Sequence, residues 1–345
     1  MSFRGWLSIV TFVLIGVIIY FSRHELVHAW QLLEKVNLWI LALLIPVQIL
    51  SYYAAGEMIF EYLRAKGSLN KVPRSTLVRM SLELNFVNHV LPSGGVSGIS
   101  YMNWRLGLLG VNSSRATMAQ VVRYASGFAA FIILLLIAVI VVTIDGNVNR
   151  WIILVSSVLA TVMVVVMLGV VYLLGNNRRM EKFAGWLTRA INRIVRVVTF
   201  KRVKQVIKLA DVEKYFVELH HDYLALKREK KILIRPFIWG LVLNITEMSM
   251  FVITFWALGQ AVNPAPVLIA YGVASMAGFF VITPGGAGAY EALMIGFLAI
   301  AGIAGSVAIA GIVLTRVIVL LGTIVLGYAS YQMALLKYGK SPIKR

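Results

Sequence analysis

Two stretches of this chain decide how it folds: Leu91-Pro92-Ser93-Gly94-Gly95-Val96-Ser97-Gly98 and Thr283-Pro284-Gly285-Gly286-Ala287-Gly288. Each interrupts an apolar region that is long enough to enter a membrane. Proline and glycine release backbone N–H and C=O groups from helical pairing, and lipid offers these groups no partner. Such breaks persist only where protein surrounds them or where they line a polar cavity. An arginine follows each break at nearly the same distance: Arg123 lies 31 residues after Pro92, and Arg316 lies 32 residues after Pro284.

The composition is that of an integral membrane protein. Of the 345 residues, 60% are apolar and only 14% are charged, and the mean hydropathy is +0.84. The absence of cysteine excludes disulfides and cysteine-ligated metals. We expect no metal or cofactor, because the adjacent His220 and His221 face different sides of a helix and no further ligands follow. No phosphate-binding loop or hydrolase motif occurs, so we do not expect an enzyme.

Hydropathy predicts an all-α polytopic fold with about six full transmembrane spans and two re-entrant helical hairpins. The hairpins are the two broken regions, 77–110 and 266–304. The first span is retained rather than cleaved as a signal peptide, because bulky Tyr20 and Phe21 replace the small residues of a cleavage site. The full spans cover about 6–21, 36–55, 115–143, 151–174, 234–258 and 306–335.

The distribution of cations predicts the orientation. If the N-terminus is cytoplasmic and each hairpin returns to its side of entry, 25 of the 33 Lys and Arg residues are cytoplasmic and three are outside. Cytoplasmic loops carry an excess of cations. We therefore expect a multi-pass protein of the cell membrane with both termini in the cytoplasm.

This topology makes the two halves inverted copies of each other. The hairpin at 77–110 enters from the cytoplasm, whereas the hairpin at 266–304 enters from outside. Inverted repeats with broken helices are typical of secondary transporters. We divide the chain into an N-terminal membrane half (1–175), a basic interfacial segment (176–233) and a C-terminal membrane half (234–345).

The basic segment accounts for most of the net charge of +19. Its position between two apolar spans favours a membrane surface with anionic lipid and argues against nucleic acid. Apolar residues recur there at helical spacing from Phe183 to Val198, with cations on the rest of the wheel, which is typical of a helix in the interface plane. A linker helix packed on the membrane domain fits this pattern equally well.

Ionisable residues inside a membrane are costly and usually functional. Arg123 and Arg316 present planar forks of donors that fit a phosphate or carboxylate, and we expect both to bind substrate together with Glu247 and Glu291. In the alternative, Arg316 pairs with Glu247 or Glu291 only to hold two spans together. Glu291 could equally be a helix-start carboxylate that the helix dipole stabilises.

The breaks themselves are candidate anion sites, because backbone N–H groups at a helix start carry partial positive charge. The site residues expected there are Pro92, Gly94 and Gly95 in the first break and Pro284, Gly285, Gly286 and Gly288 in the second. Asn88 precedes the first break and joins the expected site. Asn85 and His89 lie on one helix face, which indicates either a wet cavity or mutual hydrogen bonding.

The chain resembles the flippase-type membrane region of the lysylphosphatidylglycerol synthase family. The resemblance rests on Asn88 with 91–95, the span with Arg123, the stretch 283–291 and Arg316, and it covers nearly the whole chain. The acid that usually follows Pro92 in such proteins is missing from Val96-Ser97-Gly98-Ile99. The family implies movement of a phospholipid or polyprenyl-linked lipid between leaflets. Ten residues follow the last span, so we expect no soluble synthase domain in this chain.

These observations predict a lipid transporter, flippase- or scramblase-like, for an anionic phospholipid or a polyprenyl-phosphate-linked lipid. Two alternatives remain open: a non-transporting membrane partner of a lipid-modifying complex, and a membrane enzyme that acts on lipid-linked phosphate or sugar. The sequence leaves the headgroup, the energy source and the oligomeric state open.

Overall fold

The structure, a computed structural model, describes residues 31, 34, 36–91, 96–144, 150–198, 208–278 and 288–338, with backbone alone at 194–198 and 277–278. The predicted span 6–21 lies outside the described residues. So do Pro92, Gly94 and Gly95 of the first break and Pro284, Gly285 and Gly286 of the second.

The described residues form helices without strands, as the sequence predicts. The helices are α3 (Leu38–Leu41), α4 (Leu44–Ala65), α5 (Arg74–Val90), α6 (Val96–Leu108), α7 (Ser113–Ile144), α8 (Arg150–Leu174), α9 (Asn177–Val198), α10 (Leu209–Arg228), the 3₁₀ turn η1 (Lys230–Leu233), α11 (Ile234–Ala257), α12 (Pro264–Gly278), α13 (Ala289–Ile300) and α14 (Gly305–Tyr338).

Among the described residues, five helical segments are long and apolar enough to cross a membrane: α3 with α4, α7, α8, η1 with α11, and α14. They correspond to the predicted spans from 36–55 onward. Helix α4 continues beyond the predicted span 36–55, to Ala65. Charged side chains of this extension satisfy each other, because Arg64 forms ion pairs with both Glu57 and Glu61.

A short break separates α3 from α4, and Pro46 explains it. In a continuous helix the proline ring would clash with the carbonyl of residue 42. In the third position of α4, Pro46 needs no N–H partner. The side chain of Asn37 caps α3 by accepting the N–H groups of Trp39 and Ile40.

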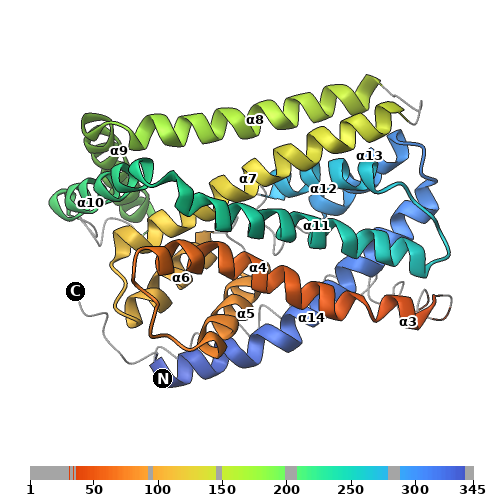
Figure 1. The fold of residues 1–345 in the computed structure, drawn as a ribbon, viewed down its shortest axis with the longest axis horizontal. Coiled ribbons are helices and arrows are strands. Elements are labelled where there is room, and N and C mark those ends of the chain that lie inside the picture. The colour runs from red at the N-terminus through yellow and green to blue at the C-terminus, as the bar shows by residue number, and fades with distance from the viewer. Residues whose placement is uncertain are drawn as a thin grey trace.

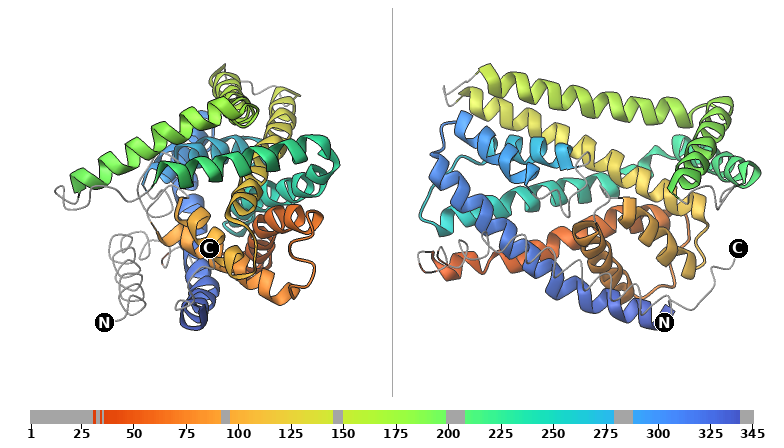
Figure 2. Two further views of the ribbon diagram at one scale, coloured as in Figure 1. Left: turned by 90° about the vertical axis from the view of Figure 1, so that its left-hand side faces the viewer. Right: turned by 180° about the vertical axis from the view of Figure 1, so that it is seen from behind.

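The long helices lie roughly side by side, and the two shorter helix pairs occupy opposite ends of the bundle (Figure 1). The pair α5 and α6 lies toward the end covered by α9 and α10, whereas α12 and α13 lie toward the other end. Helix α14 crosses the molecule obliquely and packs against both α5 and α13 (Figure 2). It therefore connects the two helix pairs.

The basic segment forms two helices: α9 covers the predicted amphipathic stretch, and α10 follows it. Helix α9 buries Met180 and Ala184 against the same core as α10, and the Phe183 ring packs edge-on against Phe216. Trp186, by contrast, is 57% exposed. Part of the apolar stripe of α9 is thus used inside the protein, and Trp186 is left on the surface among the cations.

A buried ion pair joins the two helices of the first pair. Arg105 of α6 donates from Nε and Nη2 to the two carboxylate oxygens of Glu83 on α5, at 2.7 and 3.3 Å. Both side chains are at most 5% exposed. The Tyr101 hydroxyl donates to the same carboxylate at 3.0 Å, and the Tyr338 ring at the end of α14 lies 4.9 Å from the Arg105 guanidinium. The pair fixes α5, α6 and α14 together.

Substitution of one partner should destabilise the protein, whereas substitution of both should not. We expect Arg105→Met to cost about 3–5 kcal/mol, because it leaves the Glu83 carboxylate buried without a counter-charge. The double variant Glu83→Gln with Arg105→Met should recover most of this loss, since the introduced glutamine side chain still accepts a hydrogen bond from Tyr101. Thermal unfolding midpoints in one detergent measure the difference. Equal midpoints for the wild type and Arg105→Met would contradict this role.

Candidate functional site

Arg316 of α14 lies at the centre of a group of polar side chains in the middle of the bundle. Its Nε donates to Glu291 Oε1 at 2.7 Å, and its guanidinium stacks 4.3 Å from the ring of Tyr290. The position is eleven residues after Gly305, about 16 Å along the helix, a length comparable to half of a hydrocarbon core about 30 Å thick.

Glu291 has two functions in this arrangement. One carboxylate oxygen binds Arg316, and the other accepts the backbone N–H of Gly288 at 2.7 Å, so Glu291 also caps the start of α13. Gly288 has φ +88°, a conformation that side chains other than glycine rarely adopt. The two interpretations of Glu291, ion-pair partner and helix-start carboxylate, therefore both apply.

Glu247 of α11 lies near both arginines without forming an ion pair with either. It accepts a hydrogen bond from Ser51 of α4 at 2.5 Å, and no ion pair within the described parts of the chain includes it. Arg316 and Arg123 both lie close enough to interact electrostatically with its carboxylate. Of the two acids expected to pair with Arg316, the structure thus selects Glu291, and Glu247 lies near both arginines without direct contact.

A neutral hydrogen-bond network continues from this centre along α4 and α14. Gln48 donates to the Tyr52 hydroxyl at 2.8 Å and to the Val319 carbonyl at 2.7 Å, and the Tyr52 hydroxyl bonds to Thr323. A side chain at Gly322 would collide with Gln48. Sequence reasoning missed these residues because they carry no charge. The signal was available, since Gln48 is a polar residue inside an apolar run.

The end of α5 approaches the same centre from the other side. The His89 ring lies 6.2 Å from the Tyr52 ring, and His89 lies close enough to Arg316 to interact with its charge. His89 Nδ1 bonds to the backbone carbonyl of Asn85 at 2.8 Å, so these two residues share a face as predicted. The end of α5 and the start of α13 therefore both lie near Arg316.

Asn88 has an incomplete set of hydrogen bonds. Its Oδ1 is buried and accepts no hydrogen bond from any described residue. A Cβ on Gly98 of α6 would overlap this oxygen, so glycine at 98 is what allows α6 to pass Asn88 so closely. Asn88 thus lies beside the first break, as expected, and packs between α5 and α6.

Arg123 of α7 differs from Arg316 in its surroundings. Among the described residues, its buried Nη1 has no hydrogen-bond partner and no carboxylate lies within ion-pair distance. Its guanidinium lies 5.3 Å from the ring of Tyr124. The two arginines occupy corresponding positions in the sequence, but one is paired and the other keeps a donor available.

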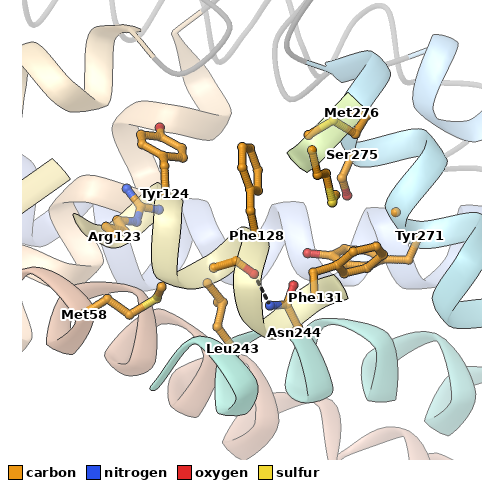
Figure 3. A pocket seen from close by; sticks show the side chains of 13 residues that line it. Met58, Arg123, Tyr124, Phe128, Phe131, Leu243, Asn244, Tyr271, Ser275 and Met276 are labelled. Atoms are coloured by element: carbon orange, nitrogen blue, oxygen red, sulfur yellow. Dashed lines mark hydrogen bonds between the residues drawn. The ribbon is translucent and has the colours of Figure 1, made fainter. Parts of the chain in front are cut away.

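Arg123 lines a cavity of about 190 Å³ between α4, α7, α8, α11 and α12 (Figure 3). Aromatic side chains, among them Phe128, Phe131 and Tyr271, line it together with methionines and Leu243. Asn244 contributes a polar group, although its amide already donates to the carbonyls of Gly127 and Gly240. The cavity thus combines one cationic group with a largely apolar wall.

The chain matches the sequence profile of the lysylphosphatidylglycerol synthase TM region over residues 6–327. The chain belongs to this family. A relative described as a UPF0104 membrane protein, from Methanothermobacter thermautotrophicus, is 24% identical over 234 residues, which cover 67% of this chain and 67% of the relative. The expected family is therefore confirmed.

The site brings together Arg316, Glu291 and Glu247, with Arg123 close enough to act on Glu247. The middle of an otherwise apolar bundle thus holds two cations and two acids, and within the described residues Arg316 alone of the two cations has a contact ion pair. Such a centre can exchange ion-pair partners without moving a bare charge into lipid, and an incoming anion could take part in that exchange.

The Arg316–Glu291 pair predicts a specific pattern of stability. Arg316→Gln should destabilise the protein by about 3–5 kcal/mol, because it leaves Glu291 without its cation in a low dielectric. Arg316→Gln with Glu291→Gln should recover most of this loss. The control is Glu247→Gln, which keeps an acceptor for Ser51 and disturbs no contact ion pair of the described residues. Thermal unfolding midpoints compare the four proteins, and a double variant as unstable as the single one would contradict the pairing.

Proposed function

We propose that this protein is a flippase- or scramblase-like transporter that moves an anionic lipid between the leaflets of the cell membrane. The lipid is a phospholipid or a polyprenyl-phosphate-linked lipid. The observation that carries this proposal is the partial exposure of charged groups in the middle of the bundle. Arg316 is 19% exposed, although Ile312, Val313 and Val319 on the same face of α14 are all buried. Its side chain therefore stays partly accessible although these neighbours are buried.

Partial exposure of this ion pair favours transport over a structural role. A charge at the bilayer centre is expensive, and such residues usually face a bundle interior or a water-filled cavity that forms a substrate path. If the pair only held helices together, complete burial would serve better. The guanidinium fork also matches a phosphate, which accepts two parallel hydrogen bonds.

The family name supports a lipid as the substrate. Lysylphosphatidylglycerol is a phospholipid, so the family profile links this membrane region to a phosphate-bearing lipid. The part-exposed arginines supply the complementary charge. A soluble anion would leave the long apolar walls of the Arg123 cavity without a function.

The placement of the two short helix pairs supports an alternating mechanism. We assign α5 with α6 to a re-entrant hairpin open to the cytoplasm, because these helices lie toward the end that carries the basic helices α9 and α10. We assign α12 with α13 to a second hairpin open to the outside. Two inverted hairpins whose ends meet near Arg316 would expose one centre to each side in turn.

Reconstitution tests this function. Purified protein in vesicles should move fluorescent NBD-labelled phosphatidylglycerol between leaflets, so that dithionite added outside bleaches the label of both leaflets rather than the outer one. NBD-labelled glucosylceramide, which has no phosphate, should stay in place. The double variant Arg316→Gln with Glu291→Gln should be stable but at least about tenfold slower, since a charged hydrogen bond contributes about 1.5–3 kcal/mol.

Two results would contradict the proposal. The first is vesicles whose labelled phosphatidylglycerol stays in its original leaflet, both without a gradient and with an imposed proton or sodium gradient. That result favours the non-transporting partner. The second is chemical conversion of the lipid, detected by mass spectrometry, which favours an enzyme.

A further inference from the structure

A lipid-facing groove adjoins the Arg123 cavity. It lies between α8 and α12, has a volume of about 320 Å³, and is lined by apolar residues that include Val158, Val162 and Val273. Val158 and Val162 are 55% and 42% exposed, so the groove opens outward. Met276 lines both the groove and the Arg123 cavity. A charged cavity inside the bundle and an apolar groove on its surface therefore adjoin at one side chain.

The close approach of α12 to its neighbours determines where this junction lies. A Cβ on Gly272 would overlap the Phe131 ring of α7 and lie 2.9 Å from Leu159 of α8, so the helices are in contact at this level. Met276 lies one turn further along α12. Its flexible side chain, with three rotatable bonds, is the element at the junction that can move most easily.

The charges at the cavity determine which molecule fits. Within the described residues, Arg123 keeps a buried donor without a partner, whereas Arg316 is held by Glu291. A guanidinium with no acid in direct contact and a buried donor left without a partner favours an anionic ligand in a low dielectric, even though Glu247 lies nearby. Phosphate offers the geometry that matches its planar fork. The described side chains that line the groove are all hydrocarbon or thioether, so the remainder of the molecule that occupies it must be hydrocarbon.

We propose that the cavity and the groove together bind one lipid molecule, with its phosphate at Arg123 and a hydrocarbon chain along α8 and α12. This lipid enters sideways from the membrane, past Met276. The inference rests on the proposed function and extends it: it assigns the first binding site of the lipid to Arg123 and leaves Arg316 as a second centre deeper in the bundle. Free phosphate would engage the cavity alone and gain nothing from the groove.

Photo-crosslinking maps this site on the intact protein. A phosphatidylglycerol analogue with a diazirine in its chain is added to the protein in nanodiscs of zwitterionic lipid, and labelled peptides are identified by mass spectrometry. We expect labelling on 154–162 and 273–276. It should fall by about tenfold or more in Arg123→Gln, the loss expected for one charged hydrogen bond. It should also fall in Val162→Trp, because the larger side chain fills the groove. Excess inorganic phosphate should not displace the analogue. A glucosylceramide analogue with the same chain should show no dependence on Arg123.

The matched control is Val164→Trp. Val164 and Val162 are 41% and 42% exposed on the same helix, but Val164 does not line the groove. Two residues apart on a helix they face nearly opposite directions. Val164→Trp should therefore leave labelling and transport unchanged, and Met276→Trp should reduce both. Thermal unfolding midpoints identify any variant that is misfolded.

The outcomes separate this inference from the proposed function. Labelling that is uniform around the bundle, or unaffected by Arg123→Gln and Val162→Trp, would overturn the site, and it would do so even if phosphatidylglycerol is translocated normally. Site-specific labelling in a wild-type protein that translocates no lipid would support the site and contradict transport. Displacement of the analogue by inorganic phosphate would overturn the choice of a lipid.

Discussion

The ion pair between Arg316 and Glu291 is the interaction on which the arrangement of this bundle depends. A cation in the middle of a membrane requires a partner, and the only acid that forms an ion pair with Arg316 in the described parts of the chain is Glu291. Because Glu291 also binds the Gly288 N–H, the same carboxylate fixes both the start of α13 and its position on α14. The end of α5 also lies near this centre, with His89 beside Tyr52. One charged centre thus lies close to the start of α13 and to the end of α5.

The two arginines illustrate how equivalent sequence positions acquire different properties. Arg316 has a contact counter-charge and a stacked ring, whereas Arg123 has a ring and a donor that no described residue accepts. Glu247 lies near both and accepts a hydrogen bond from Ser51. An anion that binds Arg123 would be drawn toward a centre in which Arg316 can exchange Glu291 for a new partner. One bundle can therefore hold a first binding site at Arg123 and a second site at Arg316.

Apolar run length predicted the helices that could cross a membrane, and the proline–glycine breaks predicted where α5 and α6, and α12 and α13, are divided. The extent of α4 was not predictable, because Glu57, Glu61 and Arg64 resemble the solvated end of a helix although they pair with one another.

Their charges within apolar segments identified Arg123, Arg316, Glu247 and Glu291 as site candidates. Which acid pairs with which arginine could not be predicted, because it depends on how helices distant in the sequence pack together. Neutral polar residues such as Gln48 and Tyr52 are harder to recognise in the sequence as members of the site, because they carry no charge. The cavity at Arg123 depends on the contact of Gly272 with Phe131, which no local pattern encodes.

Accessibility of the two helix pairs from opposite sides is the most direct test of the account. The chain has no cysteine, so single cysteines report without background. Suitable positions are Ser97 at the start of α6 and Ala289 at the start of α13, both half-buried; Gly288 is unsuitable because a side chain there would be strained. The measurement is modification by a membrane-impermeant thiol reagent added to sealed vesicles of known orientation. The account predicts that Ser97→Cys is modified only from the cytoplasmic side and Ala289→Cys only from outside. Modification of both from the same side would contradict it.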